Sequence, residues 1–479
     1  MPNNKYIENL KELFKKTFNE EVTLIENIRA DGSNRQIIRL FSRDKSFVGV
    51  YGPDKKENRA FIEFSKHFES KKFPVPHIYS YDEARQVYIE SDLGNKTLFD
   101  CVKEERKGVE FPSSLIDKYK KSLSYLALFQ TSTLEGLNLD FCYPRKEFDE
   151  QSMMWDLNYF KYYFLKLGNI SFDEQNLEND YKKMVDFIKL APRNFFLYRD
   201  FQSRNIMIKK DELYFIDYQG GRKGFLAYDV ASLLYDAKTD IPPDMRKELL
   251  NYYLNLDNIK KVISRTEFLK YYYYFVCIRL MQAMGAYGLR GFYERKTYFL
   301  TSVPYVIKNI EWILSNVNFE IKLPEIIRVF KKITTSTYLR QFSDKQLGLN
   351  LRIYSFSYKD GFPDDPQGHN GGFVFDTRCL DNPGKNSLYA HLTGKDIEVK
   401  KFLDNNSEVE KFYKNCLSLV EQATQNYISR NFTELYVAFG CTGGRHRSVY
   451  MAERLYRDFI NKKNIKPVMR HIYLEKENL

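Results

Sequence analysis

Along the first 95 residues, short apolar segments alternate with turns, and this pattern predicts mostly strands with one helix. Apolar residues alternate over 37–41 and again over 47–51, which predicts a β-hairpin around the polar turn between them. Phenylalanines recur at helical spacing over 58–70, so we expect a helix there. A further strand is expected at 87–90. The N-terminal part should therefore be a small sheet accompanied by one helix.

The remainder of the chain divides into a helical part and a second strand-rich part. Helical spacing is strongest over 152–167 and returns from 228 to about 317, whereas 195–216 shows the pattern of strands. A new alternation from 347 onward predicts a strand that opens another domain. The basic, polar segment before it is expected to be a helical linker without a core of its own. The predicted divisions are 1–95, 96–318, 319–346 (linker) and 347–479.

Composition is that of a soluble globular protein with more than one core. The chain has 479 residues, of which 43% are hydrophobic and 29% charged, a balance that excludes disordered and collagen-like classes. No apolar run approaches the roughly 18–20 residues that a membrane span needs, and the N-terminus lacks the charged-then-apolar order of a signal peptide. We expect a cytoplasmic protein without a membrane partner.

Cysteine spacing and net charge exclude few functions. The six cysteines are scattered without a Cys-x-x-Cys pair, so a disulfide framework or a zinc knuckle is not expected. The formal net charge of +11 is spread along the chain. Such a diffuse positive field suits anionic small molecules as well as RNA, so charge alone does not decide the partner.

The most informative motif is Tyr-Arg-Asp-Phe-Gln-Ser-Arg-Asn at 198–205, followed by Ile-Asp-Tyr-Gln at 216–219. Between Asn205 and Asp217, two short apolar runs flank a Lys-Asp turn and predict a hairpin. Such a hairpin brings Asn205 and Asp217 together at one end, close to Asp200. Phosphoryl transfer needs this set: a carboxylate that accepts the proton of the acceptor hydroxyl, and an amide with a carboxylate that hold Mg²⁺ on the phosphates.

These motifs resemble the aminoglycoside phosphotransferase/choline kinase superfamily, over residues 20–315. The likeness is greatest to its anomeric N-acetylmuramate/N-acetylglucosamine kinase branch. Further matching pieces are Asp-Gly-Ser-Asn-Arg at 31–35, Pro-Val-Pro-His at 74–77, Tyr-Asp-Val-Ala-Ser-Leu-Leu at 228–234 and Arg-Leu-Met-Gln-Ala-Met-Gly-Ala-Tyr at 279–287. The resemblance implies a two-lobed protein-kinase-like fold, of the α+β class, with ATP and Mg²⁺ as cofactors.

The resemblance also implies roles for individual residues. Asp200 would be the catalytic base, and Asn205 and Asp217 would bind Mg²⁺. Asp229 would support the catalytic loop. Gly32, Ser33 and Asn34 would cover the ATP phosphates. The family's usual catalytic-loop histidine is Tyr198 here, and the strand at 47–51 has no phosphate-binding lysine, an absence shared with the anomeric kinases. Arg39, Lys55 or Lys56 could supply the missing charge.

A second motif, Cys-Thr-Gly-Gly-Arg-His-Arg-Ser at 441–448, lies between a predicted strand at 434–440 and a predicted helix at 449–461. A glycine loop between a strand and a helix N-terminus directs backbone N–H groups at an anion, and Arg447 could clamp a phosphate through two parallel bonds. The same spacing, Cys-x5-Arg-Ser, is that of cysteine phosphatases. Such an enzyme would need a general acid, for which Asp364, Asp365 or Asp376 are candidates.

Residues 347–479 resemble the C-terminal domain of the RapZ RNase adapter family. Its matching pieces are Ser-Phe-Ser-Tyr-Lys-Asp-Gly-Phe-Pro at 355–363, Phe-Val-Phe-Asp-Thr-Arg at 373–378, Leu-Thr-Gly-Lys-Asp at 392–396 and Gly-Cys-Thr-Gly-Gly-Arg-His-Arg-Ser-Val-Tyr at 440–450. The resemblance implies a smaller α/β domain that senses glucosamine 6-phosphate and binds a small RNA. The implied ligand residues are Asp376, Arg378, Cys441, Thr442, Gly443, His446 and Arg447. Gly384 stands where that family usually has histidine.

Together these observations predict an ATP- and Mg²⁺-dependent kinase for a cell-wall amino sugar, acting in peptidoglycan recycling. The expected acceptor is the anomeric hydroxyl of N-acetylmuramate or N-acetylglucosamine, and the C-terminal domain is expected to bind a phosphorylated amino sugar. Two alternatives stay open. One is an RNA-binding adapter with a sensor kinase-like half, which needs a contiguous basic face near 462–470. The other is an aminoglycoside kinase, which needs an acidic acceptor pocket.

Overall fold

The computed structural model describes residues 5–28, 35–106, 111–342, 349–363, 372–429, 432 and 434–477. The chain divides into two compact units. Unit 1 comprises Met1–Thr297 with Ser315–Ile327, and unit 2 comprises Tyr298–Leu314 with Arg328–Leu479. Unit 1 has an N-terminal β-sheet and a helical lobe, and unit 2 has a parallel sheet with helices, so the predicted fold class is confirmed. The four predicted domain boundaries themselves stay predictions.

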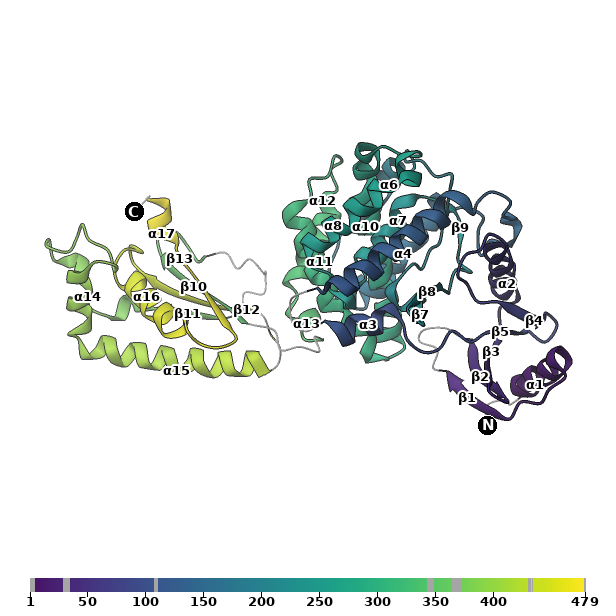
Figure 1. Cartoon of the computed structure of the whole chain (residues 1–479). Helices are drawn as coiled ribbons and strands as arrows, with labels where there is room; N and C mark the ends of the chain where they lie inside the picture. Colours follow the sequence, from purple (N-terminus) through teal and green to yellow (C-terminus); the bar gives the residue numbers. More distant parts are fainter. Residues whose placement is uncertain are drawn as a thin grey trace. The chain divides into compact units, whose positions relative to one another are not determined.

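The N-terminal sheet of unit 1 is antiparallel throughout, in the order β1-β2-β3-β5-β4. Its strands are β1 (Leu24–Ile28), β2 (Gln36–Ser42), β3 (Lys45–Tyr51), β4 (Ile78–Asp82) and β5 (Val87–Ser91). Helix α1 (Lys5–Phe18) packs Leu10 and Phe14 onto one face of this sheet (Figure 1). Asp54 caps the N-terminus of helix α2 (Lys55–Ser70), because its carboxylate accepts hydrogen bonds from two backbone N–H groups of the first turn. The predicted hairpin and helix are both present.

The rest of unit 1 is a mainly helical lobe that also carries two small ribbons. The ribbons pair β6 (Phe195–Leu197) with β9 (Arg222–Gly224), and β7 (Ile206–Lys209) with β8 (Glu212–Phe215). The α-helices are α3 (Leu98–Glu105), α4 (Ser113–Ser132), α5 (Glu150–Tyr159), α6 (Glu174–Ile188), α7 (Leu226–Leu234), α8 (Pro243–Asn255), α9 (Asp257–Lys260) and α10 (Arg265–Gly288). Its core contains buried aromatic side chains, including Tyr198, Phe201, Phe215 and Tyr218.

The strongest helical pattern, at 152–167, forms two kinds of helix rather than one. Helix α5 passes at Phe160 into a π-helix that ends at Lys166. Helix α10 packs closely here, because a Cβ atom added at Gly288 would lie 2.1 Å from the backbone oxygen of Tyr163. Glycine therefore permits a helix contact that no other residue would allow without a shift of the backbone.

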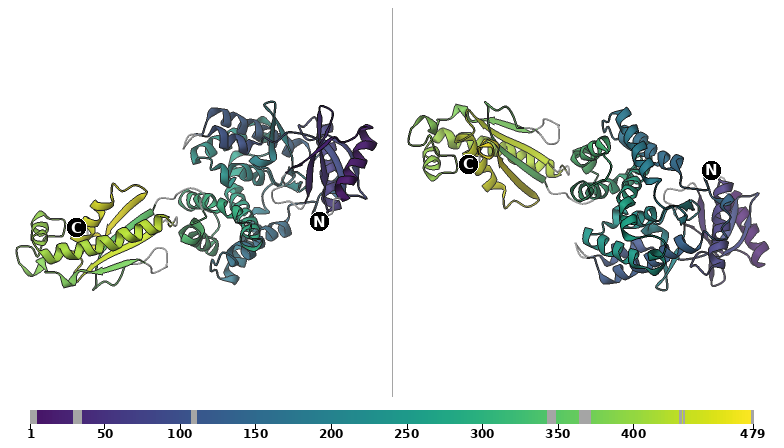
Figure 2. Two further views of the ribbon diagram at one scale, coloured as in Figure 1. Left: turned by 90° about the horizontal axis from the view of Figure 1, so that it is seen from below. Right: turned by 90° about the horizontal axis from the view of Figure 1, so that it is seen from above.

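Unit 2 contains a four-stranded parallel sheet in the order β11-β12-β10-β13. The strands are β10 (Leu349–Ser357), β11 (Phe373–Asp376), β12 (Glu434–Cys441) and β13 (Ile465–His471), and the accompanying helices are α14 (Ile397–Asp404), α15 (Ser407–Ser429), α16 (Arg447–Phe459) and α17 (Ile472–Lys476). Side chains of α14, α15 and α16 form one core with those of β10 and β12. The long helix α15 runs alongside the sheet in each view (Figures 1 and 2).

The segment expected as a helical linker without a core of its own is helical, as predicted, and its apolar side chains are buried. It contains α12 (Pro324–Thr335) and α13 (Thr337–Arg340), and it follows α11 (Val303–Asn316). Val329 and Phe330 are among its fully buried residues. Its apolar residues recur at helical spacing, so one face of the segment is buried. In the described ranges, no helix is both long and apolar enough to cross a membrane.

Candidate functional site

The loop that carries Asp200 follows strand β6 and is held in place from helices α7 and α5. The Asp229 carboxylate of α7 accepts hydrogen bonds from the backbone N–H groups of Tyr198 (2.7 Å) and Arg199 (2.9 Å). Burial raises the pKa of Asp229 to about 7, against the effect of these two bonds. Arg199 has a φ angle of 85°, and its guanidinium donates to both oxygens of Asp156, at 2.6 and 2.7 Å. Asp229 thus makes the loop-supporting contacts that the resemblance implies.

The β7–β8 hairpin places Asn205 beside Asp217. Their elements meet where the backbone N–H of Ile216 donates to the carbonyl of Asn205, at 3.1 Å. The Asn205 amide donates to the backbone carbonyl of Asp200 (2.8 Å) and to the Asp217 carboxylate (3.1 Å). The predicted meeting of Asn205 and Asp217 next to Asp200 is confirmed as geometry. Their functions remain predictions.

The carboxylates of Asp200 and Asp217 lie close enough to repel each other. Burial raises the pKa of Asp200, and the nearby negative charge of Asp217 raises it further, while Arg199 and Arg279 oppose the rise. The Asp217 carboxylate also accepts a hydrogen bond from the Gln219 amide at 2.8 Å. An amide oxygen and a carboxylate are hard oxygen donors of the kind that bind Mg²⁺ together with phosphate groups. The residues therefore fit a magnesium ion.

Arg35 is a basic side chain that the structure places beside Asp217, and sequence reasoning gave it no role. Its guanidinium pairs with Glu57 of α2 at 2.6 Å and approaches the Asp217 carboxylate at 3.9 Å. Only 9% of its surface is exposed. Arg35 ends the Asp-Gly-Ser-Asn-Arg motif, so its position three residues after Gly32 was the available signal in the sequence. Lys55 and Lys56, two of the expected substitutes, are exposed on the surface of α2.

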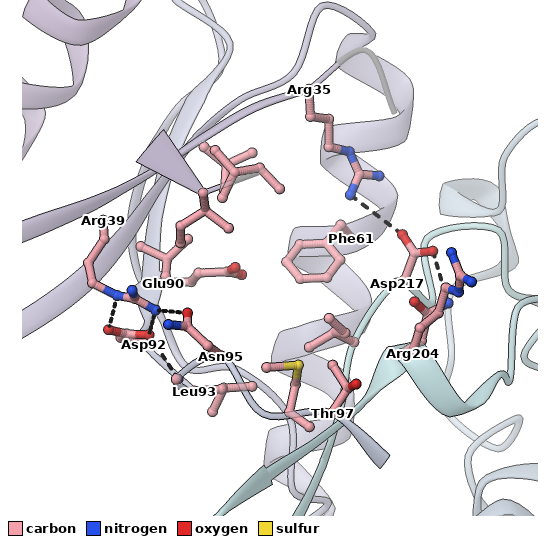
Figure 3. Close-up of a pocket in the computed structure, with 18 of the residues that line it drawn as sticks. Arg35, Arg39, Phe61, Glu90, Asp92, Leu93, Asn95, Thr97, Arg204 and Asp217 are labelled. Carbon is pink, nitrogen blue, oxygen red and sulfur yellow. Dashed lines mark hydrogen bonds and ion pairs between the residues drawn. The ribbon is translucent and has the colours of Figure 1, made fainter. Parts of the chain in front are cut away.

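A cavity of about 1030 Å³ opens beside these residues in unit 1. Arg35, Asn205 and Asp217 line it, and so does Arg39, the third cation that the sequence suggested. Arg39 lies at the other end of the view in Figure 3, where it pairs with Asp92 at 2.6 Å and with Asn95 at 2.7 Å. Gly32, Ser33 and Asn34, expected over the phosphates, lie outside the described residues. Asp200 is joined to the cavity wall through Asn205.

In unit 2, the predicted glycine loop connects β12 to α16. Gly444 has a φ angle of 65°, and a Cβ atom there would lie 3.0 Å from Ser357, so the turn requires glycine. None of the hydrogen bonds among the described residues is donated by the backbone N–H groups of residues 442–445. Thr442 is exposed, and space is open around Gly443. The loop thus presents backbone donors at the start of a helix, the arrangement that binds anions.

The expected ligand side chains of unit 2 gather around this loop. Arg447 donates through Nη1 to the backbone carbonyls of Arg378 (3.1 Å) and Leu380 (2.8 Å). Its Nε atom is buried and lacks a hydrogen-bond partner in the described part of the chain. Arg378 pairs with Asp376 at 2.6 Å, next to the loop because Asp376 faces Gly440 across the sheet. One edge of Arg447 is thus anchored, and the Nε side retains a donor.

Cys441 and His446 are set into the wall of the loop rather than exposed on it. The Cys441 thiol lies 3.2 Å from the Ser448 hydroxyl, and only 3% of Cys441 is exposed. His446 contacts the backbone carbonyl of Tyr389 at 2.9 Å, and burial lowers its pKa. Of the general acids suggested for a phosphatase, Asp364 and Asp365 lie outside the described residues, and Asp376 is held by Arg378.

Two family models match parts of this chain. Residues 144–263 match the phosphotransferase enzyme family, and residues 349–475 match the RapZ C-terminal domain. The chain therefore carries a kinase-like phosphotransferase domain fused to a RapZ C-terminal domain. The first match contains the Asp200 loop and the Asn205–Asp217 hairpin, and the second contains the glycine loop.

Individual relatives match only part of their own length. A nucleotide-binding protein of Methylobacillus flagellatus is 37% identical over 139 residues, which are 29% of this chain and 48% of the relative. One of Xanthomonas axonopodis pv. citri is 43% identical over 111 residues, 23% of this chain and 37% of the relative. The chain thus spans less than half the length of these curated relatives. Among solved structures, choline kinase LicA from Streptococcus pneumoniae aligns with a TM-score of 0.42 at 14% identity, covering 65% of this chain and 99% of LicA.

Proposed function

We propose that unit 1 is an ATP- and Mg²⁺-dependent kinase that phosphorylates the anomeric hydroxyl of a cell-wall amino sugar, N-acetylmuramate or N-acetylglucosamine. The observation that carries the phosphotransfer is the convergence of Asp200, Asn205 and Asp217 at one side of a large cavity, with Arg35 beside them. The acceptor sugar is supported by the family resemblance of the motifs at 31–35 and 279–287.

Each residue of this group has a definite task in the proposed reaction. Asp200 accepts the proton of the attacking hydroxyl, and its raised pKa makes it a better base than an exposed carboxylate. Asn205 and Asp217 would hold Mg²⁺, which when bound neutralises charge on the phosphates. Arg35, oriented by Glu57, offers its guanidinium to the same phosphates and replaces the lysine that the strand lacks.

An aminoglycoside acceptor is less well supported. A polycationic drug requires free acidic side chains, and the segment 148–167 holds three carboxylates. All three are engaged by cations: Asp149 by Arg145, Glu150 by Lys189 and Asp156 by Arg199. A neutral or acidic sugar does not need to compete with these pairs.

For unit 2 we propose binding of a phosphorylated amino sugar at the glycine loop. The loop N–H groups, the start of α16 and the Nε atom of Arg447 are the donors that support it. An RNA-binding role has less support, because two of the basic residues in 462–470 are paired, Lys462 with Glu421 and Arg470 with Glu475. Hydrolysis by Cys441 would require a thiolate that attacks from a nearly buried position.

A panel of amino sugars offered with ATP and Mg²⁺ tests the proposal, with products identified by phosphorus NMR. We expect a phosphorylated N-acetylmuramate or N-acetylglucosamine whose phosphate is released in mild acid, because glycosyl phosphates hydrolyse readily. An acid-stable sugar phosphate would move the reaction to another hydroxyl. Turnover of aminoglycosides in place of amino sugars would replace the proposed acceptor class.

A further inference from the structure

We propose that Glu90 reads the base of the nucleotide in unit 1 and selects adenine over guanine through a neutral carboxyl group. This inference rests on the proposed kinase function. It concerns the part of the cavity that the metal-binding and phosphate-binding residues do not use, and it assigns a residue for which the sequence suggested no role.

Glu90 lies on β5 and directs its side chain into the cavity. It faces Val48 of β3 across the strand pair, so both side chains lie on the same face of the sheet, and both line the cavity. In Figure 3, Glu90 lies between Arg39 with Asp92 on one side and Arg35 with Asp217 on the other, and its carboxyl group points toward Phe61. It thus occupies the middle of the cavity wall.

One oxygen of the Glu90 carboxyl group has no hydrogen-bond partner among the described residues. Its Oε2 atom is buried and makes no hydrogen bond with any described residue. Buried polar atoms are nearly always paired, and leaving one unpaired costs free energy that a bound ligand can recover. Arg35 pairs with Glu57 and Arg39 pairs with Asp92, while the positive charge of Arg35 still acts on Glu90.

The surroundings of Glu90 suit a flat, partly apolar ring. The apolar side chains that line the cavity come from both lobes of unit 1 and include Ile37, Val48 and Val50 from the sheet and Met207 and Ile216 from the helical lobe. Because the phosphates belong at the Arg35–Asp217 end, the base of the same nucleotide must lie farther along the cavity. Glu90 is the carboxyl group that the base would meet there.

Protonation decides which base this carboxyl group prefers. Burial raises the pKa of Glu90 to about 8, and the charge of Asp92 adds to the rise while Arg35 opposes it. Besides Glu90, the charged residues that line the cavity are the basic Arg35, Arg39, Lys103, Arg204 and Arg290 and the acidic Glu26, Asp54, Glu57, Asp92, Asp100 and Asp217. At neutral pH the group is therefore mostly neutral, with one O–H donor and one acceptor oxygen.

That donor–acceptor pair matches adenine. Adenine has an amino donor next to the ring acceptor N7, whereas the corresponding edge of guanine presents two acceptors, N7 and O6. A neutral carboxyl group can bond both atoms of the adenine edge but only one of the guanine edge. An ionised carboxylate has acceptors alone, so it would lose the bond to N7 and favour the paired N–H donors on the opposite edge of guanine.

The test compares wild type, Glu90→Gln and Glu90→Leu as full chains, with Mg²⁺ and the non-hydrolysable analogues of ATP and GTP. Binding is measured by calorimetry at pH 7 and pH 9. Glutamine keeps one donor and one acceptor without titrating, whereas leucine has neither. We expect wild type and Glu90→Gln to prefer the adenine nucleotide by about 10-fold or more at pH 7, and Glu90→Leu to lose that preference. At pH 9 the preference should weaken in wild type and persist in Glu90→Gln.

Magnesium tripolyphosphate, which has no base, is the control ligand and should bind all three proteins equally. Thermal unfolding without nucleotide checks that all three proteins are folded. Equal discrimination in wild type and Glu90→Leu would overturn the inference while leaving a kinase that binds both nucleotides. Loss of the adenine preference in Glu90→Gln as well would also overturn it, because the carboxylate form would then be required. If wild type binds neither nucleotide nor tripolyphosphate, the proposed function and the inference fall together.

Discussion

The sharpest test of the proposed active site is Asp200→Asn, which removes the proposed base and preserves its shape. Asp200 accepts a hydrogen bond from the Gln202 amide at 3.3 Å, and the carbonyl oxygen of asparagine can accept the same bond. A positioned base contributes about 10²–10⁴-fold to kcat, or roughly 3–5 kcal/mol of the barrier. We expect kcat to fall by that factor. The KM for ATP should change little, because Asn205, Asp217 and Arg35 are untouched.

The thermal stability of Asp200→Asn, unlike its kcat, should not fall. Burial and the charge of Asp217 raise the pKa of Asp200, so the fold disfavours its ionised form. A carboxyl group with a raised pKa in the native state lowers stability as pH rises from its unfolded pKa to its folded pKa, and the loss persists above that window. A neutral asparagine removes this loss. Asp200→Asn should therefore unfold at the same or a higher temperature than wild type at neutral pH.

Steady-state kinetics and thermal unfolding together test whether Asp200 is the catalytic base. Asp211→Asn is the matched control. Asp211 is exposed at the turn of the β7–β8 hairpin with a φ angle of 62°, which asparagine tolerates, so activity and melting should both stay at wild-type values. A kcat for Asp200→Asn within about threefold of wild type would refute the assignment of the base. A large activity loss accompanied by a lower melting temperature would assign the residue to folding instead.

Four further substitutions, one of them a control, test the other proposed contacts. Arg35→Ala should weaken MgATP binding about 10–100-fold in calorimetry, as expected for lost charged hydrogen bonds. Arg39→Ala should weaken MgATP binding less, because Asp92 holds the Arg39 guanidinium. Equal losses of affinity in the two variants would contradict the choice of Arg35. Arg447→Ala should weaken binding of glucosamine 6-phosphate about 10–100-fold. Thermal unfolding is recorded as well, because Nη1 of Arg447 also donates to two backbone carbonyls. Unchanged affinity would show that Arg447 does not contact the ligand. Cys441→Ser should leave that affinity nearly unchanged, whereas phosphate release that disappears with this change would establish a phosphatase.

Local sequence pattern by itself determined much of the proposed active site. The hairpin between Asn205 and Asp217 could be predicted because two short apolar runs around a turn leave the chain few other ways to pair. Its length then decides that the residues at its two ends meet, and the position of Asp200 five residues earlier follows from the chain itself. The glycine loop before α16 was predictable for the same reason, since strand, turn and helix are consecutive.

Tertiary packing decided which charged groups act together. Several basic residues lie within or near the first strands, and their order in the chain does not tell which one faces Asp217. Arg35 does so because it packs against Glu57, 22 positions away on another element, whereas Arg39 is drawn to Asp92, 53 positions away. The sequence likewise shows Glu90 as one polar residue in an apolar strand. Its burial in the cavity wall leaves Oε2 without a hydrogen-bond partner among the described residues and raises the pKa of Glu90. That burial depends on elements that are distant in the chain, so the sequence does not show it.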